Sequence, residues 1–271
     1  MVSHRLYVSS CVAVVNVLIA TAACTGSARA AGAPCKSRLS PADHVIALNE
    51  VQNLMGRYSH LAEEHGEGSL QDLFAMKTEG VSWKSPRGPE GIEAMKARFA
   101  MPAEDPLHFP GQLHMHSMFT PVIEIAADGK TAQGVWDSFG PSVQTVAAGT
   151  GWLWVKYGVD FIKEDGQWKI WHLQVFPIFN TPYNTSLTDN AKAMAARAAA
   201  PPGPPAGAAP AADGPAAGPN GATMAMPGQK WTGPNDPLWI YDAKTPLRGP
   251  RVPEPYCTYD PSKSAAQYAP S

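Results

Sequence analysis

The spacing of apolar residues changes once along the chain, from a helical period to a strand period. From residue 41 to about residue 65, apolar side chains recur every three or four positions, as expected for one face of a helix, at Val45, Leu48, Val51, Leu54, Met55, Tyr58 and Leu61. Ser40 and Pro41 are typical of an N-cap and a first helical position. The pattern therefore predicts one long amphipathic helix over 41–65.

Shorter elements follow this helix. Residues 69–75 read as a short helix with Ser69 as its cap, and residues 81–84 read as a short strand. Residues 91–99 read as a third helix, because Ile92, Met95 and Phe99 share one face. Two short helices and one strand are therefore expected before residue 100.

After residue 111 the apolar period falls to two, which is typical of half-buried strands. Four strands are predicted, at 113–125, 131–139, 152–163 and 168–176. The turn sequence Ala127-Asp128-Gly129 separates the first two of these strands, and Glu164-Asp165-Gly166 separates the last two. Helices first and strands later predict an α+β domain over 41–190 with a mainly antiparallel sheet.

The first thirty residues differ from this domain in composition. Arg5 precedes an apolar run, Val12 to Ala23, and Ala28-Arg29-Ala30 supplies the small residues that a signal peptidase needs. The run is too short for a permanent membrane span. We expect a signal peptide cleaved after Ala30 and a periplasmic or secreted protein; a cytoplasmic protein is the alternative.

Two further segments flank the domain. Residues 31–40 read as a short polar leader, and residues 191–228 are so rich in alanine, proline and glycine that they cannot bury enough apolar surface to fold. We therefore expect a disordered linker there. Residues 229–271 carry too many large side chains for a free end, among them Trp231, Trp239, Ile240, Tyr241, Tyr256 and Tyr259. We expect this segment to lie extended along the domain.

The net charge bears on the class of partner, and the cysteines bear on a possible disulfide in the mature chain. Loss of residues 1–30 removes two arginines and no acids, which takes the formal net charge from −2 to −4 and argues against nucleic acid or anionic membrane as a partner. Cys35 and Cys257 remain near the two ends of the mature chain. In an oxidising compartment they could form a disulfide, and two unpaired thiols are the alternative.

Sequence motifs for metals and nucleotides are not found in the chain. It contains no paired CxxC and no HExxH, so no metal site is predicted. It also contains no GxSxG, Walker or Rossmann pattern. We therefore expect no metal ion and no cofactor.

Five short motifs follow one another in the order typical of the SnoaL-like branch of the nuclear transport factor 2-like superfamily. They are Tyr58-Ser-His-Leu-Ala-Glu63, Leu70-Gln-Asp-Leu-Phe-Ala75, Gly91-Ile92, His116-Ser-Met-Phe-Thr120-Pro-Val-Ile123 and Asp165-Gly166-Gln-Trp168-Lys-Ile170. Most of 44–176 thus resembles this family. The resemblance implies a cone-shaped fold, in which a curved, mainly antiparallel sheet wraps a long N-terminal helix and two shorter helices and leaves a pocket at one end.

The resemblance also selects candidate catalytic residues. It places His116 in the pocket, where an imidazole suits general acid or base catalysis; a core histidine bonded to backbone is the alternative. Related enzymes use both the tyrosine and the acid of the first motif, so Tyr58 would donate a hydrogen bond to a substrate oxygen and Glu63 would orient the imidazole. The alternatives are a half-buried aromatic and a solvated acid. Apart from the resemblance, His172 is in register with the face of Trp168 on the last strand and would be a second pocket histidine; a structural role is the alternative.

Candidate substrate-binding residues come from strand alternation and from aromatic content. Alternation places His114, Met118 and Thr120 on the face of their strand that carries the motif histidine. Two residues depart from the family pattern, since Glu63 stands where an aspartate is usual and Thr120 where an asparagine is usual; both departures put a direct transfer of mechanism in doubt.

Two further pairs of residues stand out within the strands. Trp83 and Trp136 would offer aromatic surface to a planar ligand, although packing explains such residues equally well. Asp137 and Asp160 are acids within strands. We expect them to face water on the open side of the sheet, and pairing with a pocket group is the alternative.

These residues and the resemblance together predict a class of function. We expect a cofactor-independent lyase, dehydratase or isomerase that acts on a small hydrophobic, aromatic or phenolic molecule by general acid–base catalysis. One alternative is a non-catalytic small-molecule-binding or oligomerisation module of the same fold. Another is an interaction protein that engages a partner through its linker and tail. The family implies a homodimer or a homotrimer.

Overall fold

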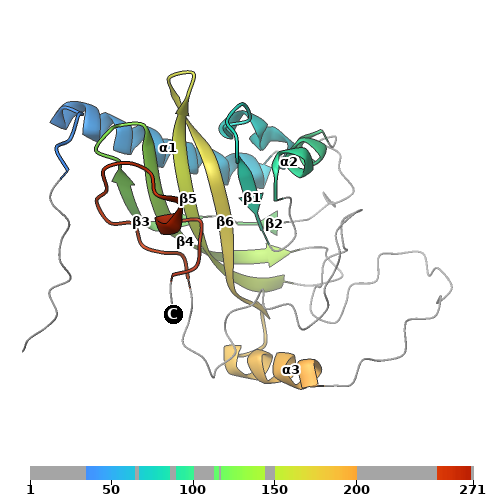
Figure 1. The fold of residues 1–271 in the computed structure, drawn as a ribbon. Coiled ribbons are helices and arrows are strands. Elements are labelled where there is room, and N and C mark those ends of the chain that lie inside the picture. Colours follow the sequence, from blue (N-terminus) through green and yellow to red (C-terminus); the bar gives the residue numbers. More distant parts are fainter. Residues whose placement is uncertain are drawn as a thin grey trace, which may run out of the picture. The chain divides into compact units, whose positions relative to one another are not determined.

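Six strands of the described part of the chain form one sheet. The computed structural model describes residues 35–64, 67–85, 90–100, 113–115, 117–143, 150–199 and 249–269. The strands are β1 (Ser82–Lys84), β2 (Leu113–His114), β3 (Met118–Ile125), β4 (Thr131–Val143), β5 (Thr150–Glu164) and β6 (Gln167–Pro182). Their order is β1-β6-β5-β4-β2, β3 also pairs with β4, and only β1 runs parallel to its neighbour (Figure 1).

The helices are α1 (Pro41–Glu64), the 3₁₀ helix η1 (Glu67–Leu73), α2 (Ile92–Phe99), α3 (Leu187–Ala199) and the short 3₁₀ helix η2 (Pro261–Lys263). At the start of α1, the hydroxyl of Ser40 accepts a hydrogen bond from the Asp43 amide at 3.1 Å, which confirms the predicted N-cap. None of the described helices is long and apolar enough to cross a membrane. The predicted α+β class, with helices before a mainly antiparallel sheet, is confirmed.

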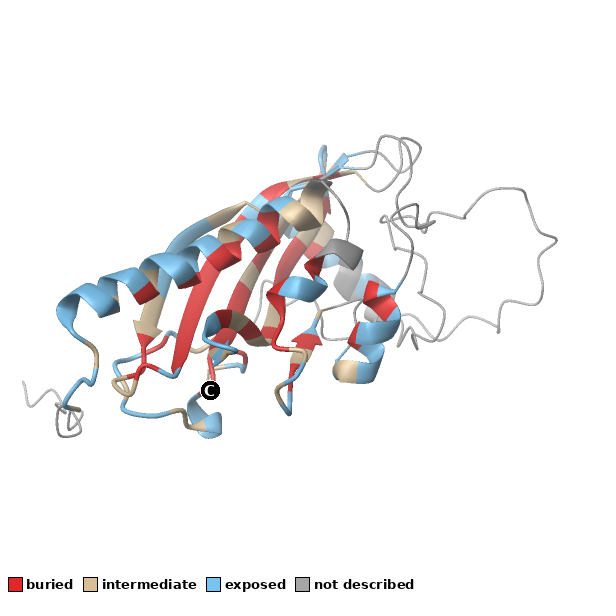
Figure 2. Ribbon diagram, turned by 90° about the horizontal axis from the view of Figure 1, so that it is seen from above, coloured by how far each residue is buried: buried red, intermediate tan, exposed pale blue. Residues whose placement is uncertain are grey.

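Helix α1 packs against one face of the sheet, which we call the inner face. Its buried residues are Ala47, Val51, Leu54, Met55 and Tyr58. Figure 2 shows the buried residues concentrated on the central strands and on the side of α1 that faces them. Val45 was expected in this apolar stripe but is 64% exposed, because the stripe begins only at Ala47.

The C-terminal tail, residues 249–269, covers part of the opposite, outer face. Alternation along β4 turns Ala132 and Trp136 inward to the core, whereas the Gln133 side chain donates to the tail carbonyl of Lys263 at 3.2 Å. The approach is so close that the carbonyl of Ala265 occupies the place of a Cβ at Gly158, and a larger residue there would displace the tail. Both faces of β4 and β5 are therefore covered over much of their length.

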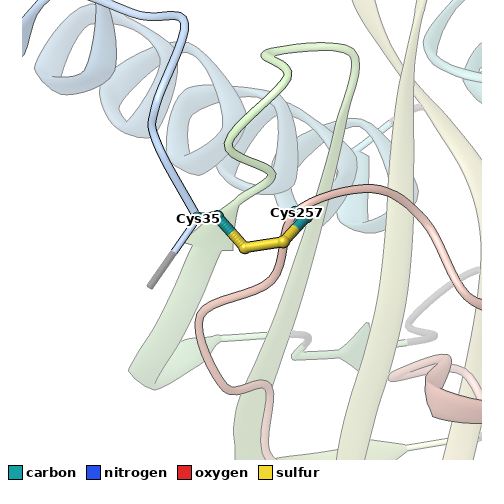
Figure 3. The surroundings of a disulfide bond; sticks show 2 residues. All are labelled: Cys35 and Cys257. Atoms are coloured by element: carbon teal, nitrogen blue, oxygen red, sulfur yellow. A yellow bond between two sulfur atoms is a disulfide. The ribbon is translucent and has the colours of Figure 1, made fainter. Parts of the chain in front are cut away.

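A disulfide between Cys35 and Cys257 ties the tail to the segment that precedes α1 (Figure 3). The two Cα atoms are 5.4 Å apart and 222 positions apart in the sequence. Beside it, the amides of Ala127 and Asp128 in the β3–β4 turn donate to the carbonyls of Tyr256 and Cys257 at 2.9 and 3.1 Å. The N-terminal and C-terminal segments of the domain thus meet at one turn of the sheet.

The predicted strand 113–125 is two strands in the structure, with an irregularity inside the second. The pairing of β3 with β4 shifts register between Phe119 and Val122, and Thr120 has a φ of 45°. Pro121 lies at the shift and has no N–H to donate to a ladder. A residue with positive φ at such a bulge interrupts the regular alternation of side chains.

The predicted linker begins too early. Residues 191–199 belong to α3, which starts with the Ser186 hydroxyl accepting from the Asp189 amide at 3.1 Å. The alanine-rich sequence that suggested disorder is also the best helix-forming composition. Residues 200–228, like the predicted signal peptide, lie outside the described residues.

Loss of the disulfide should lower stability without unfolding the protein. Cys257→Ser opens a covalent loop of more than two hundred residues, so we expect its free energy of unfolding to fall by about 2–5 kcal/mol. Urea denaturation of the mature chain with and without reductant measures this. Reductant should lower the stability of the wild type only; an equal response of the variant would mean that the bond is absent.

Candidate functional site

Tyr58 lies at the centre of the inner face. It is 2% exposed, and its ring meets the rings of Phe74 and Tyr157 edge-on, with centroids 6.5 and 5.9 Å away. Its position late in α1 gives it the same helical face as Leu54 and Met55, which are also buried. The phenol is therefore held by a packed aromatic surface.

Trp83 extends this surface from the edge of the sheet. Because β1 pairs with β6, Trp83 lies opposite Leu173, and its ring stacks on Phe99 with centroids 5.9 Å apart and planes 13° apart. Phe74 lies between Trp83 and Tyr58, 5.9 Å from the indole. We call Tyr58, Phe74, Trp83, Phe99 and Tyr157 the inner aromatic cluster.

The indole nitrogen of Trp83 is buried, and within the described residues it has no hydrogen-bond partner. Leaving a buried donor unpaired costs about 1–3 kcal/mol, because the group loses its water without gaining an acceptor. Trp168 shares this condition at its own indole nitrogen, and the ammonium of Lys163 lies 5.0 Å from its ring. The sequence alone gives no sign of either unpaired donor.

Two of the predicted substrate-binding residues, Trp136 and Met118, also lie on the inner side. Trp136 is 3% exposed with its ring edge-on to Phe161, and Met118 packs against the buried core. Glu63 lies in the last turn of α1 and is half-buried. Arg98 on α2 is buried as well, which the helical spacing of that segment did not predict.

The side chains of the two histidines of the predicted strand, His114 and His116, lie outside the described residues. His116 lies outside the described residues. The backbone of His114 pairs with Ser142 of β4, and its side chain is outside the described part. The convergence of His116 with Tyr58 and Glu63 thus stays a prediction.

Thr120 lies on the outer face, contrary to the expected alternation with Met118. Its hydroxyl donates to the Asp137 carboxylate at 3.1 Å, and the same carboxylate accepts from Trp154 at 3.1 Å and pairs with Lys156 at 2.7 Å. The bulge after Phe119 turns the side chain over. Burial raises the pKa of Asp137, but these three donors and the lysine charge outweigh it and hold the pKa below its usual value.

His172 also lies on the outer face, so the structure does not bring it together with Tyr58. Its neighbour Leu173 is the inward residue and has no exposed surface. The His172 Nδ1 atom instead lies 2.9 Å from the carboxylate of Asp160, the residue paired with it on β5. The expectation of a second pocket histidine is therefore corrected, and the structural role holds.

Asp160 was expected to face water and is instead completely buried beneath the tail. Besides His172, its carboxylate accepts from the Tyr259 hydroxyl at 2.9 Å, the Ser264 hydroxyl at 2.6 Å and the Ala265 amide at 3.0 Å. Burial and the adjacent carboxylate raise the pKa of Tyr259, so its phenol remains a neutral donor. Alternation with the buried Val159 and Phe161 predicts only that Asp160 points to the outer face, so the sequence carries no signal for its burial there.

This chain is similar in sequence or in fold to several known proteins. Residues 43–174 match the SnoaL-like domain family. A putative scytalone dehydratase from Novosphingobium aromaticivorans is 19% identical, with 52% of this chain and 91% of that chain covered and a TM-score of 0.42. A hexachlorocyclohexane dehydrochlorinase from Novosphingobium barchaimii is 16% identical, with 54% and 97% covered and a TM-score of 0.44. No curated protein matches this chain.

Within the described residues, no group of three or more histidine, cysteine, aspartate or glutamate side chains could hold a metal ion. The family match covers α1, the sheet as far as the middle of β6, and all the inner aromatic cluster. Over residues 43–174, this chain matches the SnoaL-like domain family, which is the family that its sequence motifs resemble.

Proposed function

We propose that this protein is an enzyme that moves a proton on a small hydrophobic, aromatic or phenolic molecule, without a metal or nucleotide cofactor. The reaction is a lyase, dehydratase or isomerase reaction. The SnoaL-like match supports this proposal, because residues 43–174 include Tyr58, Glu63 and His116 in the order of the family motifs.

The observation that carries the proposal is the buried indole N–H of Trp83 in the inner aromatic cluster, which has no hydrogen-bond partner among the residues that the structure describes. A bound molecule with an oxygen acceptor would satisfy this donor, and its ring would meet the aromatic side chains around it. Sites for small molecules combine apolar walls with a few polar groups in this way. The substrate class that fits is an aromatic compound with a carbonyl or phenolic oxygen.

The chemistry assigned to the three motif residues is acid–base catalysis. His116 removes a proton from the carbon beside a carbonyl, and the electron pair moves onto the oxygen. Tyr58 donates a hydrogen bond to that oxygen as its charge develops. When the electron pair returns, it forms a carbon–carbon double bond and the C–O bond on the neighbouring carbon breaks. The hydroxyl group on that carbon takes the proton from the imidazolium and departs as water. Glu63 accepts a hydrogen bond from the other ring nitrogen and fixes the tautomer.

We further propose that the protein works outside the cytoplasm, as a homodimer or homotrimer. The disulfide between Cys35 and Cys257 supports export, because such bonds persist in oxidising compartments and are rare in the cytosol. The family resemblance supports the oligomer.

Substitution of the proposed base should abolish turnover. For His116→Ala we expect kcat to fall by about 10²- to 10⁴-fold, and Glu63→Gln should lower kcat without preventing binding. Phenolic and aromatic carbonyl compounds are screened by mass spectrometry with the mature chain and no added cofactor, and binding is followed by calorimetry. His60→Ala, an exposed histidine on α1, is the control. Unchanged activity of His116→Ala refutes the mechanism; ligand binding without turnover by the wild type favours the binding-module alternative.

Substitution of the indole should separate hydrogen bonding from packing. Trp83→Phe keeps an aromatic ring and removes the unpaired donor, so we expect affinity for an oxygen-bearing aromatic ligand to fall by about 3- to 10-fold while thermal stability changes little. Trp168→Phe removes the other unpaired buried indole N–H and is the matched control. Equal affinities for the two variants would exclude Trp83 as the ligand donor.

A further inference from the structure

The C-terminal tail is linked to β5 and β6 by one shared carboxylate. The Tyr259 hydroxyl lies 2.9 Å from the Asp160 Oδ2 atom and 3.2 Å from the His172 Nδ1 atom, and the last two atoms are 2.9 Å apart. All three groups therefore meet at one point on the outer face, where a change in the tail acts directly on the position of the imidazole.

From this point, contacts continue to the chain segment that leads into β1. The His172 ring stacks on Trp171 with centroids 4.1 Å apart, and the indole N–H of Trp171 donates to the carbonyl of Glu79 at 2.9 Å. Gly80, with a φ of 81°, lies beside this pair: a Cβ there would be in ordinary van der Waals contact with the His172 Nε2 atom, at 3.8 Å, and with the Trp171 Nε1 atom, at 3.9 Å. The stacked Trp171–His172 pair thus fixes the backbone of residues 79–80 from the outer side.

Strand β1 depends on such support because it is short and lies at the edge of the sheet. It has three residues and β6 is its only neighbouring strand among the described elements. Ser82 is paired with His172, and the next residue is Trp83. Apart from this ladder, the amide of Trp83 donates to the carbonyl of Glu90 at 3.0 Å. Short elements with few restraints open most easily.

We propose that the tail positions the Trp83 indole from the opposite face of the sheet, with Tyr259, Asp160 and the Trp171–His172 pair as positioning residues. In its claim that Trp83 meets the ligand, this inference rests on the proposed function. The tail then acts through β1, and none of its residues touches the ligand.

Two tyrosines of the tail allow a matched test. Tyr259→Phe removes the hydroxyl that bonds Asp160, whereas Tyr256→Phe removes a hydroxyl that lies 3.2 Å from Thr131 on β4, away from β1. Hydrogen exchange of the amides in 79–84 should be about 3- to 10-fold faster in Tyr259→Phe and unchanged in Tyr256→Phe. Should Tyr259→Phe not fold, Trp171→Phe, which removes the donor to Glu79, replaces it.

A double-mutant cycle tests the link to the ligand. Tyr259→Phe should raise the Kd or KM for an oxygen-bearing aromatic ligand by about threefold or more and leave kcat nearly unchanged. In a Trp83→Phe background the same substitution should have no further effect on affinity, because its action passes through the indole.

The outcomes separate this inference from the proposed function. Equal exchange in 79–84 for the two tyrosine variants overturns the positioning of β1. Faster exchange in Tyr259→Phe with additive effects on affinity overturns the route through Trp83. Faster exchange, with no aromatic ligand bound by the wild type, supports the positioning of β1 and refutes the proposed function.

Discussion

The completely buried carboxylate of Asp160 joins the C-terminal tail to strand β6 on the outer face of the sheet. Removal of a charge from water costs several kcal/mol unless hydrogen bonds replace the lost hydration. Four donors do so here, of which three belong to the tail and one to β6. Because the buried carboxyl group would lose three of these four donors without the tail, the tail is part of the folded domain.

The sheet thus serves different purposes on its two faces. Aromatic rings from α1, the residue after η1, β1, α2 and β5 form the inner aromatic cluster. This cluster contains a donor, the Trp83 indole N–H, that protein groups in the described part leave unpaired. The outer face carries polar side chains that are paired with the tail or with one another. The polar groups of the outer face are hydrogen-bonded, so covering them costs little free energy. The inner indole N–H, in contrast, would be stabilised by a bound hydrogen-bond acceptor.

Periodicity was sufficient to predict α1, its cap and the succession of strands, because these depend on local spacing and on which face is apolar. It failed for Thr120 and His172 for the same physical reason, a register shift inside a strand pair. At Thr120, a bulge beside Pro121 reversed the side-chain direction, and a count of alternate residues cannot include such a shift. His172 was expected on the face of Trp168, but the β5–β6 pairing shifts between Asp160 and Phe161, and Leu173 becomes the inward residue.

The joining of Cys35 to Cys257 turns nearly the whole domain into a covalent ring. A single peptide-bond break at any position between these two residues would open the ring and release no fragment, since both pieces would remain attached through sulfur. In surroundings rich in proteases, a nicked molecule could therefore keep its two parts together, and only a second cut or a reductant would separate them.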